Sequence, residues 1–95
     1  MEYKFSNPVI EWRGPAPFYF VEVPADISAE ISSMATQLSY GWGVIPVTAT
    51  IGRTIFTTSL FPKNGTYLLP LKVAARKPEG LGLGDTPNIS MSLQF

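Results

Sequence analysis

Apolar residues occupy every second position over much of this chain, a pattern typical of β-strands that bury one face. The alternation is clearest at residues 45–51, where every odd position is apolar. Similar stretches bounded by glycine, proline or asparagine predict six strands, at residues 2–13, 18–23, 45–51, 54–61, 67–71 and 88–95. Because most of these strands are joined by short turns, we expect an antiparallel sheet.

The first predicted strand changes parity along its length. Its apolar positions move from odd to even numbers between Phe5 and Ile10. Since parity decides which face of a sheet a side chain takes, the change predicts a bulge or an edge position at Pro8. We expect Ile10 and Trp12 to be buried and Glu11 to face solvent.

One segment has the spacing of a helix instead. After Pro24, apolar residues recur at intervals of four, three and four, at Ile27, Ile31, Met34 and Leu38. They predict one amphipathic helix over residues 25–38, which covers the sheet from one side or plugs the end of a barrel. Residues 72–77 predict a single helical turn before Pro78.

Two residue pairs predict tight hairpin turns. Gly52 followed by Arg53 places glycine first in a two-residue loop, as a type II′ turn requires. Asn64 followed by Gly65 is the pair favoured by type I′ turns. Each turn fixes the register of the two strands that it joins.

The length of the chain limits the architecture. Ninety-five residues form one domain, residues 1–95, and leave little material to cover two flat sheets. Closing one sheet on itself removes exposed edges with less chain. The sequence therefore predicts a mainly β protein, a small closed antiparallel β-barrel of about six strands with one amphipathic helix.

The composition excludes much enzyme chemistry. The chain has no cysteine and no histidine, so a lone chain has no thiolate nucleophile, imidazole base, or cysteine or histidine zinc ligand. The glycines at positions 80, 82 and 84 precede a predicted strand, whereas a dinucleotide-binding loop lies between a strand and a helix. We expect no enzyme activity, no cofactor and no metal site.

Charge is divided unevenly along the chain, although the total is zero. Residues 1–47 carry five acidic and two basic side chains, and residues 48–95 carry two acidic and five basic ones. Lys72 and Arg76 are four apart and would share a face of the predicted turn, where with Lys77 they could contact an anion or a nucleic-acid backbone. The alternative, which we favour, is a solvated basic turn that pairs with the acidic half of the chain.

Aromatic side chains indicate a second candidate site. Four of them could line an apolar pocket at the barrel mouth, with an arginine as polar anchor: Trp12, Tyr40, Trp42 and Phe56. In a small barrel the same rings more often fill the core. The candidate ligand-binding residues from both arguments are Trp42, Arg53, Lys72 and Arg76.

The sequence also bears on location. Residues 1–4 carry one acid and one base and lead directly into alternating aromatic sequence, so we expect no secretion signal. No apolar run approaches the about 18 residues of a membrane span. We expect a cytoplasmic protein that does not engage a membrane.

Taken together, the motifs of this chain resemble a bacterial family of domains of unknown function, DUF1905. They span most of the chain: FVEVP at 20–24, GWGVIPV at 41–47, TSLFP at 58–62, YLLPLK at 67–72, and RK at 76–77 followed by GD at 84–85. The resemblance implies a double-split β-barrel, a fold similar to that of some bacterial transition-state regulators and antitoxins that bind DNA as dimers. It implies no activity.

We therefore expect a non-enzymatic binding or interaction module for a small anionic ligand or a protein partner. It could self-associate as a homodimer through a sheet edge or an aromatic surface. The alternative is a DNA-binding transcriptional regulator or antitoxin-like dimer. That alternative rests on fold analogy alone, and we do not favour nucleic acid as the partner.

Overall fold

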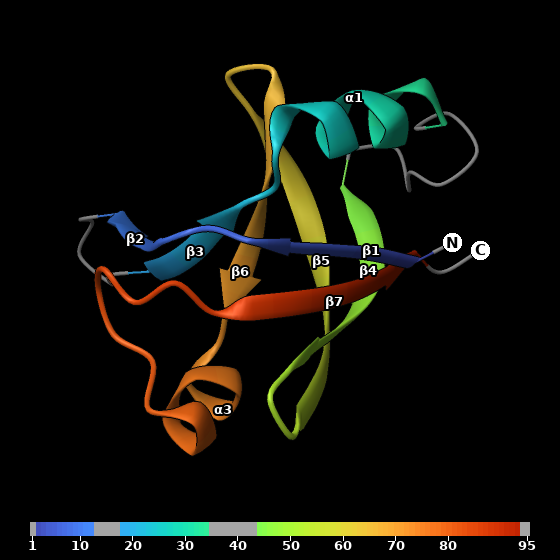
Figure 1. Cartoon of the computed structure of the whole chain (residues 1–95). Helices are drawn as coiled ribbons and strands as arrows, with labels where there is room; N and C mark the ends of the chain where they lie inside the picture. The colour runs from blue at the N-terminus through green and yellow to red at the C-terminus, as the bar shows by residue number, and fades with distance from the viewer. Residues whose placement is uncertain (1, 13–17, 35–43, 94–95) are drawn as a thin grey trace.

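The computed structural model describes residues 2–12, 18–34 and 44–93. Within these ranges the chain forms seven antiparallel strands, two short α-helices and one 3-10 turn (Figure 1). In chain order the elements are β1 (Glu2–Ser6), β2 (Val9–Trp12), β3 (Phe18–Glu22), α1 (Ala25–Ser33), β4 (Ile45–Ile51), β5 (Thr54–Lys63), β6 (Thr66–Leu71), α3 (Val73–Arg76), η1 (Lys77–Glu79) and β7 (Asn88–Leu93).

The strands follow the spatial order β1-β7-β4-β5-β6-β3-β2 and curl into a half-barrel (Figure 1). The long strand β5 belongs to both halves, because residues 54–60 pair with β4 and residues 61–63 pair with β6. We name the two halves accordingly. Sheet A contains β1, β7, β4 and the first part of β5, and sheet B contains the last part of β5 with β6, β3 and β2.

The predicted closed barrel of six strands with one helix is wrong, because the described residues form a curled half-barrel of seven strands with two helices. Pro8 divides the predicted first strand into β1, which pairs with β7, and β2, which pairs with β3. Proline has no N–H for a strand ladder, so the pairing changes there. The double-split type and the bacterial origin stay predictions.

The helices also differ from the predicted one. The helix α1 ends at Ser33, and residues 35–38 of the predicted helix lie outside the described residues. The second helix, α3, forms at the predicted helical turn. The two helices lie at opposite ends of the half-barrel (Figure 1).

The core lies on the concave side of the sheet. Ala49 at the centre of β4 pairs with Met91 on one side and Phe56 on the other, so these three side chains share the inner face. The inner alternate positions of the strands and the apolar side of α1 supply the buried residues, namely Val9, Val21, Val23, Ile31, Ile45, Val47, Ala49, Ile51, Leu60, Tyr67, Leu69, Leu71, Ile89, Met91 and Leu93.

A buried serine attaches α1 to sheet B. The Ser28 hydroxyl donates a hydrogen bond to the Val23 carbonyl (3.1 Å) and accepts one from the Tyr67 N–H (3.1 Å). Both backbone groups would otherwise lack these partners inside the protein, where an unpaired polar group is costly. Ser28 therefore fixes how α1 covers its end of the half-barrel.

Both predicted hairpin turns are confirmed. Gly52 has φ +59° while Arg53 has no positive φ, which is the type II′ pattern. Asn64 and Gly65 have φ +52° and +83°, which is the type I′ pattern. Gly52 also lies against η1: a Cβ there would overlap the Glu79 carboxylate, which accepts a hydrogen bond from the Thr54 hydroxyl (2.7 Å).

The outer face of sheet B contradicts one burial prediction. Val9 pairs with Val21 in the core, so its neighbours Ile10 and Trp12 on β2 must face outward. They are 42% and 57% exposed instead of buried. Glu11 accordingly shares the inner register with Tyr19, its partner on β3, and the prediction that it faces the solvent side of the strand is wrong. The alternation of the sequence shows which residues of β2 share a face, but it does not show which face packs against the core. The sequence therefore predicted the wrong face of β2 to be buried.

Candidate functional site

The end of the half-barrel at α3 has a hollow that we call the basic pocket. It has a volume of about 360 Å³ and is lined by Phe18, Tyr19, Pro70, Leu71, Lys72, Val73 and Arg76. Strand β3 supplies the first two of these residues, the end of β6 supplies the next two, and α3 with its preceding residue supplies the rest. The pocket therefore forms where β3 pairs with the segment that leads into α3.

Two cations of this pocket come from one helical turn. The Arg76 N–H donates to the Lys72 carbonyl (2.9 Å), so the two residues are one turn apart and both line the pocket. This confirms that Lys72 and Arg76 share a face. Lys72 is exposed and Arg76 is half-buried.

Arg76 is held in an unusual way. Its guanidinium carbon lies 3.9 Å from the centre of the Tyr19 ring, within the range of a cation–π contact. Its Nε atom is buried and has no hydrogen-bond partner in the described structure. A buried donor without an acceptor costs about 1–3 kcal/mol. An oxygen of a bound carboxylate or phosphate would supply such an acceptor, and the planar guanidinium fork matches both groups.

The other two candidate residues do not join this pocket. Arg53 lies in the turn between β4 and β5, is exposed, and is absent from the pocket lining. It is nevertheless at the same end of the molecule as α3, because the turn residue Gly52 contacts Glu79 of η1. Trp42 lies outside the described residues.

The aromatic pocket that the sequence indicated is not assembled from its two described members. Trp12 lies on the outer face of sheet B, and Phe56 lies on the inner face of β5 opposite Ala49. Strand alternation therefore points these two rings to opposite sides of the curled sheet. Tyr40, like Trp42, lies outside the part of the chain that the structure describes.

The outer face of sheet B carries an apolar cluster that sequence reasoning missed. We call it the aromatic surface, and it consists of Ile10, Trp12, Phe18, Phe20, Phe61, Leu68 and Pro70. A signal existed in β3, where apolar residues run through positions 18–21 without alternation. Such a run is expected where a strand is apolar on both faces.

The rings of the aromatic surface contact one another at its centre. Phe20 lies 6.2 Å from Phe18 and 5.2 Å from Phe61 between ring centres, and the second pair is T-shaped with an interplanar angle of 79°. Lys63 places its ammonium 5.5 Å from the centre of the Trp12 ring. Two hollows of about 280 Å³ each share Trp12, Phe20 and Phe61.

The aromatic surface and the basic pocket are continuous. Phe18 and Pro70 line both the basic pocket and one of the two aromatic hollows. The charged residues described in the lining of these three hollows are Glu11, Lys63, Lys72 and Arg76. Three cations to one anion make this combined region suited to an acidic partner.

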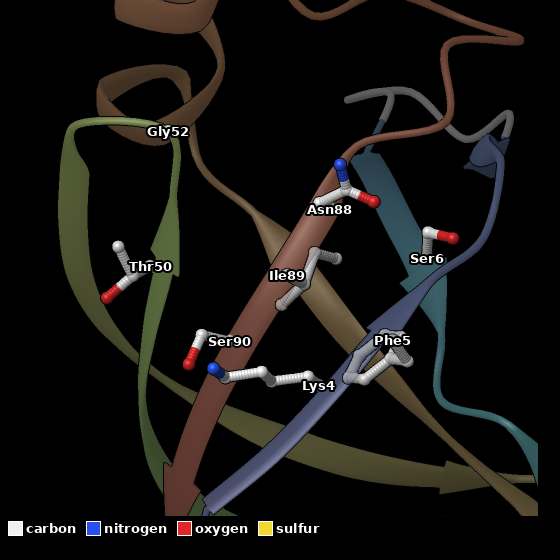
Figure 2. A pocket seen from close by; sticks show the side chains of 8 residues that line it. All are labelled: Lys4, Phe5, Ser6, Thr50, Gly52, Asn88, Ile89 and Ser90. Atoms are coloured by element: carbon white, nitrogen blue, oxygen red, sulfur yellow. The ribbon is translucent and has the colours of Figure 1, made fainter.

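Sheet A has a different hollow on its outer side, with a volume of about 500 Å³ (Figure 2). Its lining is rich in hydroxyl and amide groups and has one cation: Lys4, Phe5, Ser6, Thr50, Gly52, Asn88, Ile89 and Ser90. Figure 2 shows the Lys4 side chain reaching toward Ser90, its partner across the β1 and β7 ladder. A single exposed ammonium with hydroxyl groups gives weaker anion recognition than a guanidinium packed on a ring.

Neither a metal site nor a membrane-spanning helix is found among the described residues. No cluster of three or more acidic side chains there could hold a metal ion. No helix in those ranges has the length and apolar character needed to cross a membrane.

Comparison with known proteins gives a family without an assigned activity. No curated protein matches the chain. A family model described as "Domain of unknown function (DUF1905)" matches residues 5–91, which include β2 to α3 and therefore every residue of the basic pocket and the aromatic surface. The chain thus belongs to the DUF1905 family.

Proposed function

We propose that this protein is a non-enzymatic binding module that holds a small organic anion in the basic pocket. One observation carries the proposal: Arg76 is packed on the Tyr19 ring with its Nε buried and unpaired, beside Lys72. An arginine in this position is already ordered, so little conformational freedom remains to be lost when an anion binds.

The walls of the pocket indicate the rest of the ligand. Phe18, Pro70 and Val73 are apolar, and Val73 is 54% exposed. The volume of about 360 Å³ is in the lower part of the range of small-molecule sites. These features favour a carboxylate or phosphate that carries an aromatic or aliphatic group, with the anion at Arg76 and Lys72 and the apolar group against Phe18.

The same lining supports binding rather than catalysis. The described pocket residues include no carboxylate that could serve as a base, and the face of the one phenol-bearing ring, Tyr19, is covered by the guanidinium. General acid–base chemistry needs a titratable group within hydrogen-bonding reach of the substrate. Apart from Arg76, the titratable side chains of the described lining are Lys72 and Tyr19. The proposal assigns Lys72 to the anion and Tyr19 to Arg76, so it includes no reaction step.

The proposal is tested by titrating the full chain with benzoate and with phenyl phosphate while recording amide chemical shifts. We expect shifts at Leu71, Lys72 and Val73, and an affinity at least tenfold lower in Arg76→Gln. The matched control is Arg53→Gln, which removes the same charge at the same end of the molecule but outside the pocket. Absence of shifts at millimolar ligand, or equal losses in both variants, would overturn the proposal.

A DNA-binding regulator is the second candidate. In its support, the described cations at the α3 end are Arg53, Lys72, Arg76 and Lys77, with Glu79 as the anion among them. Titration with mixed-sequence duplex DNA at low salt tests it. No binding near about 10⁻⁵ M, the usual range for non-specific DNA binding, would remove this candidate. The homodimer and the cytoplasmic location also stay predictions.

A further inference from the structure

The aromatic surface is a second apolar cluster, separate from the core of the half-barrel. Phe20 and Leu68 are each only 4% exposed although they face outward. The Phe20 ring lies against the rings of Phe18 and Phe61, and Leu68 lines the same hollow as Phe20 and Phe61. Trp12 and Phe18 form the rim of this cluster and are 57% and 55% exposed. Large aromatic side chains gathered on one exposed face mark a binding surface more often than a chance arrangement.

The shape of the surface suits an extended chain. The two aromatic hollows share Trp12 and Phe20, and the second of them shares Phe18 with the basic pocket. Three adjoining hollows in a row can each take one side chain of an extended segment. Ile10, Trp12 and Phe18 together expose on the order of 300 Å², well below the about 800 Å² per partner of a typical stable interface. A short segment therefore fits better than a broad protein face.

The charges select the chemistry of that segment. Lys63 lies over Trp12, and Lys72 and Arg76 flank Phe18, so cations stand on both sides of the exposed ring pair. Two copies of this chain placed face to face would bring these cations against one another, which disfavours a second copy as the occupant. An apolar segment with acidic residues would instead neutralise them.

Single-stranded nucleic acid fits the ring arrangement less well. Base stacking needs exposed ring faces. The Lys63 ammonium is positioned over the Trp12 ring, and Phe20 meets Phe61 edge to face at 79°. The net charge of the whole chain is zero, so no bulk attraction to a polyanion is added.

We propose that the aromatic surface binds an extended, acidic and apolar peptide segment of another protein. Its apolar side chains occupy the hollows at Trp12 and Phe18, and its carboxylates contact Lys63 at one side and Arg76 at the other. The proposal rests on the proposed function only at Arg76, where a carboxylate of the segment takes the place of the small anion.

The experiment is selection of a random dodecapeptide phage library on the full chain, followed by anisotropy titration of the enriched peptides. We expect enrichment of peptides that combine aspartate or glutamate with leucine, phenylalanine or proline. Affinity should fall at least tenfold in Trp12→Ser and about threefold in Lys63→Gln, and stay unchanged in Arg53→Gln. Because Trp12 is a rim residue, Trp12→Ser should fold, and its urea midpoint is measured alongside.

Three outcomes would overturn the proposal. They are enrichment of basic peptides or of none, a wild-type dimer in sedimentation that Trp12→Ser converts to monomer, and a uridine decanucleotide that binds in a Trp12-dependent way. The proposed function fails separately. Benzoate and phenyl phosphate binding depends on Arg76 and should be unaffected by Trp12→Ser. A wild-type chain that selects no acidic peptide but still binds these anions would therefore remove this inference alone.

Discussion

The outer faces of the two halves of the sheet are opposite in character. On sheet A the central outward positions of β4 and β7 are Thr48, Thr50, Ser90 and Ser92, which pair with one another across the ladder. Ile55 of β5, which pairs with Thr50 and is 70% exposed, is an apolar exception on this face. On sheet B the outward positions are mainly aromatic and aliphatic, and two of them are buried. Both halves bury an apolar inner face, so the difference does not arise from the core. The difference shows that the outer face of sheet A is mainly polar, whereas the outer face of sheet B carries more apolar side chains than the core requires.

The apolar side chains on the outer face of sheet B form two groups that contribute differently to stability. Phe20 and Leu68 are withdrawn from water and therefore stabilise the fold. Trp12 and Phe18 remain more than half exposed and gain little from folding. The exposed rim therefore contributes little to stability, and its apolar area remains available to a partner. The comparison can be tested at three levels.

The largest effect is expected from Phe20→Ala at the centre of the aromatic surface. Removing this ring takes away its contacts with Phe18 and Phe61 and leaves a hollow, so the free energy of unfolding should fall by about 3 kcal/mol. The control on the outer face of sheet A is Thr50→Ala, which should change it by less than about 0.5 kcal/mol. Urea denaturation measures both. Similar changes in the free energy of unfolding for Phe20→Ala and Thr50→Ala would contradict the proposed difference between the two outer faces.

A smaller effect is expected at the rim. Trp12→Ser and Phe18→Ser should each lower the free energy of unfolding by less than about 1 kcal/mol, because more than half of each ring already meets water. Each should also reduce the fluorescence of added anilinonaphthalene sulfonate, which reports accessible apolar surface. A loss near that of Phe20→Ala would mean that the rim is structural and not kept for a partner.

The smallest effect concerns β1 of sheet A and depends on pH. Burial, with hydrogen bonding to Glu30 and its charge, raises the pKa of Tyr3, whose hydroxyl donates to Glu30 Oε1 (3.1 Å). A raised pKa means that the folded state holds the phenol proton more tightly than the unfolded state. The contribution of Tyr3 is therefore complete below about pH 10, the ordinary pKa, and is lost as pH rises above it.

The matching variant is Tyr3→Phe, whose free energy of unfolding should decline less steeply between pH 9 and pH 11 than that of the wild type. Urea denaturation across this range, with Tyr67→Phe as a second variant, isolates the contribution of Tyr3. An unchanged slope in Tyr3→Phe would show that its contact with Glu30 does not differ in energy between the two phenol states.

Much of the fold could be predicted where local rules act alone. The alternation at β4 and β7 and the two hairpin turns at Gly52 and Asn64 were predicted correctly, because period and turn geometry are properties of a few consecutive residues. The spacing of Lys72 and Arg76 likewise placed both on one face. The predictions that were wrong concern closure of the barrel, the continuity of the first strand and the burial of Trp12.

The sequence by itself determined which segments are strands, where the chain turns and which side chains share a face, because these follow from periods of two and 3.6 residues. Only the tertiary structure decided which face of the sheet is the inner one. For example, Val9 pairs with Val21 in the core, and Trp12, three positions later on the same strand, therefore faces outward. It also brought Tyr19 under Arg76, 57 residues later in the chain, by pairing Tyr19 with Leu71. Long-range strand pairing decides such contacts, and no local pattern records its register.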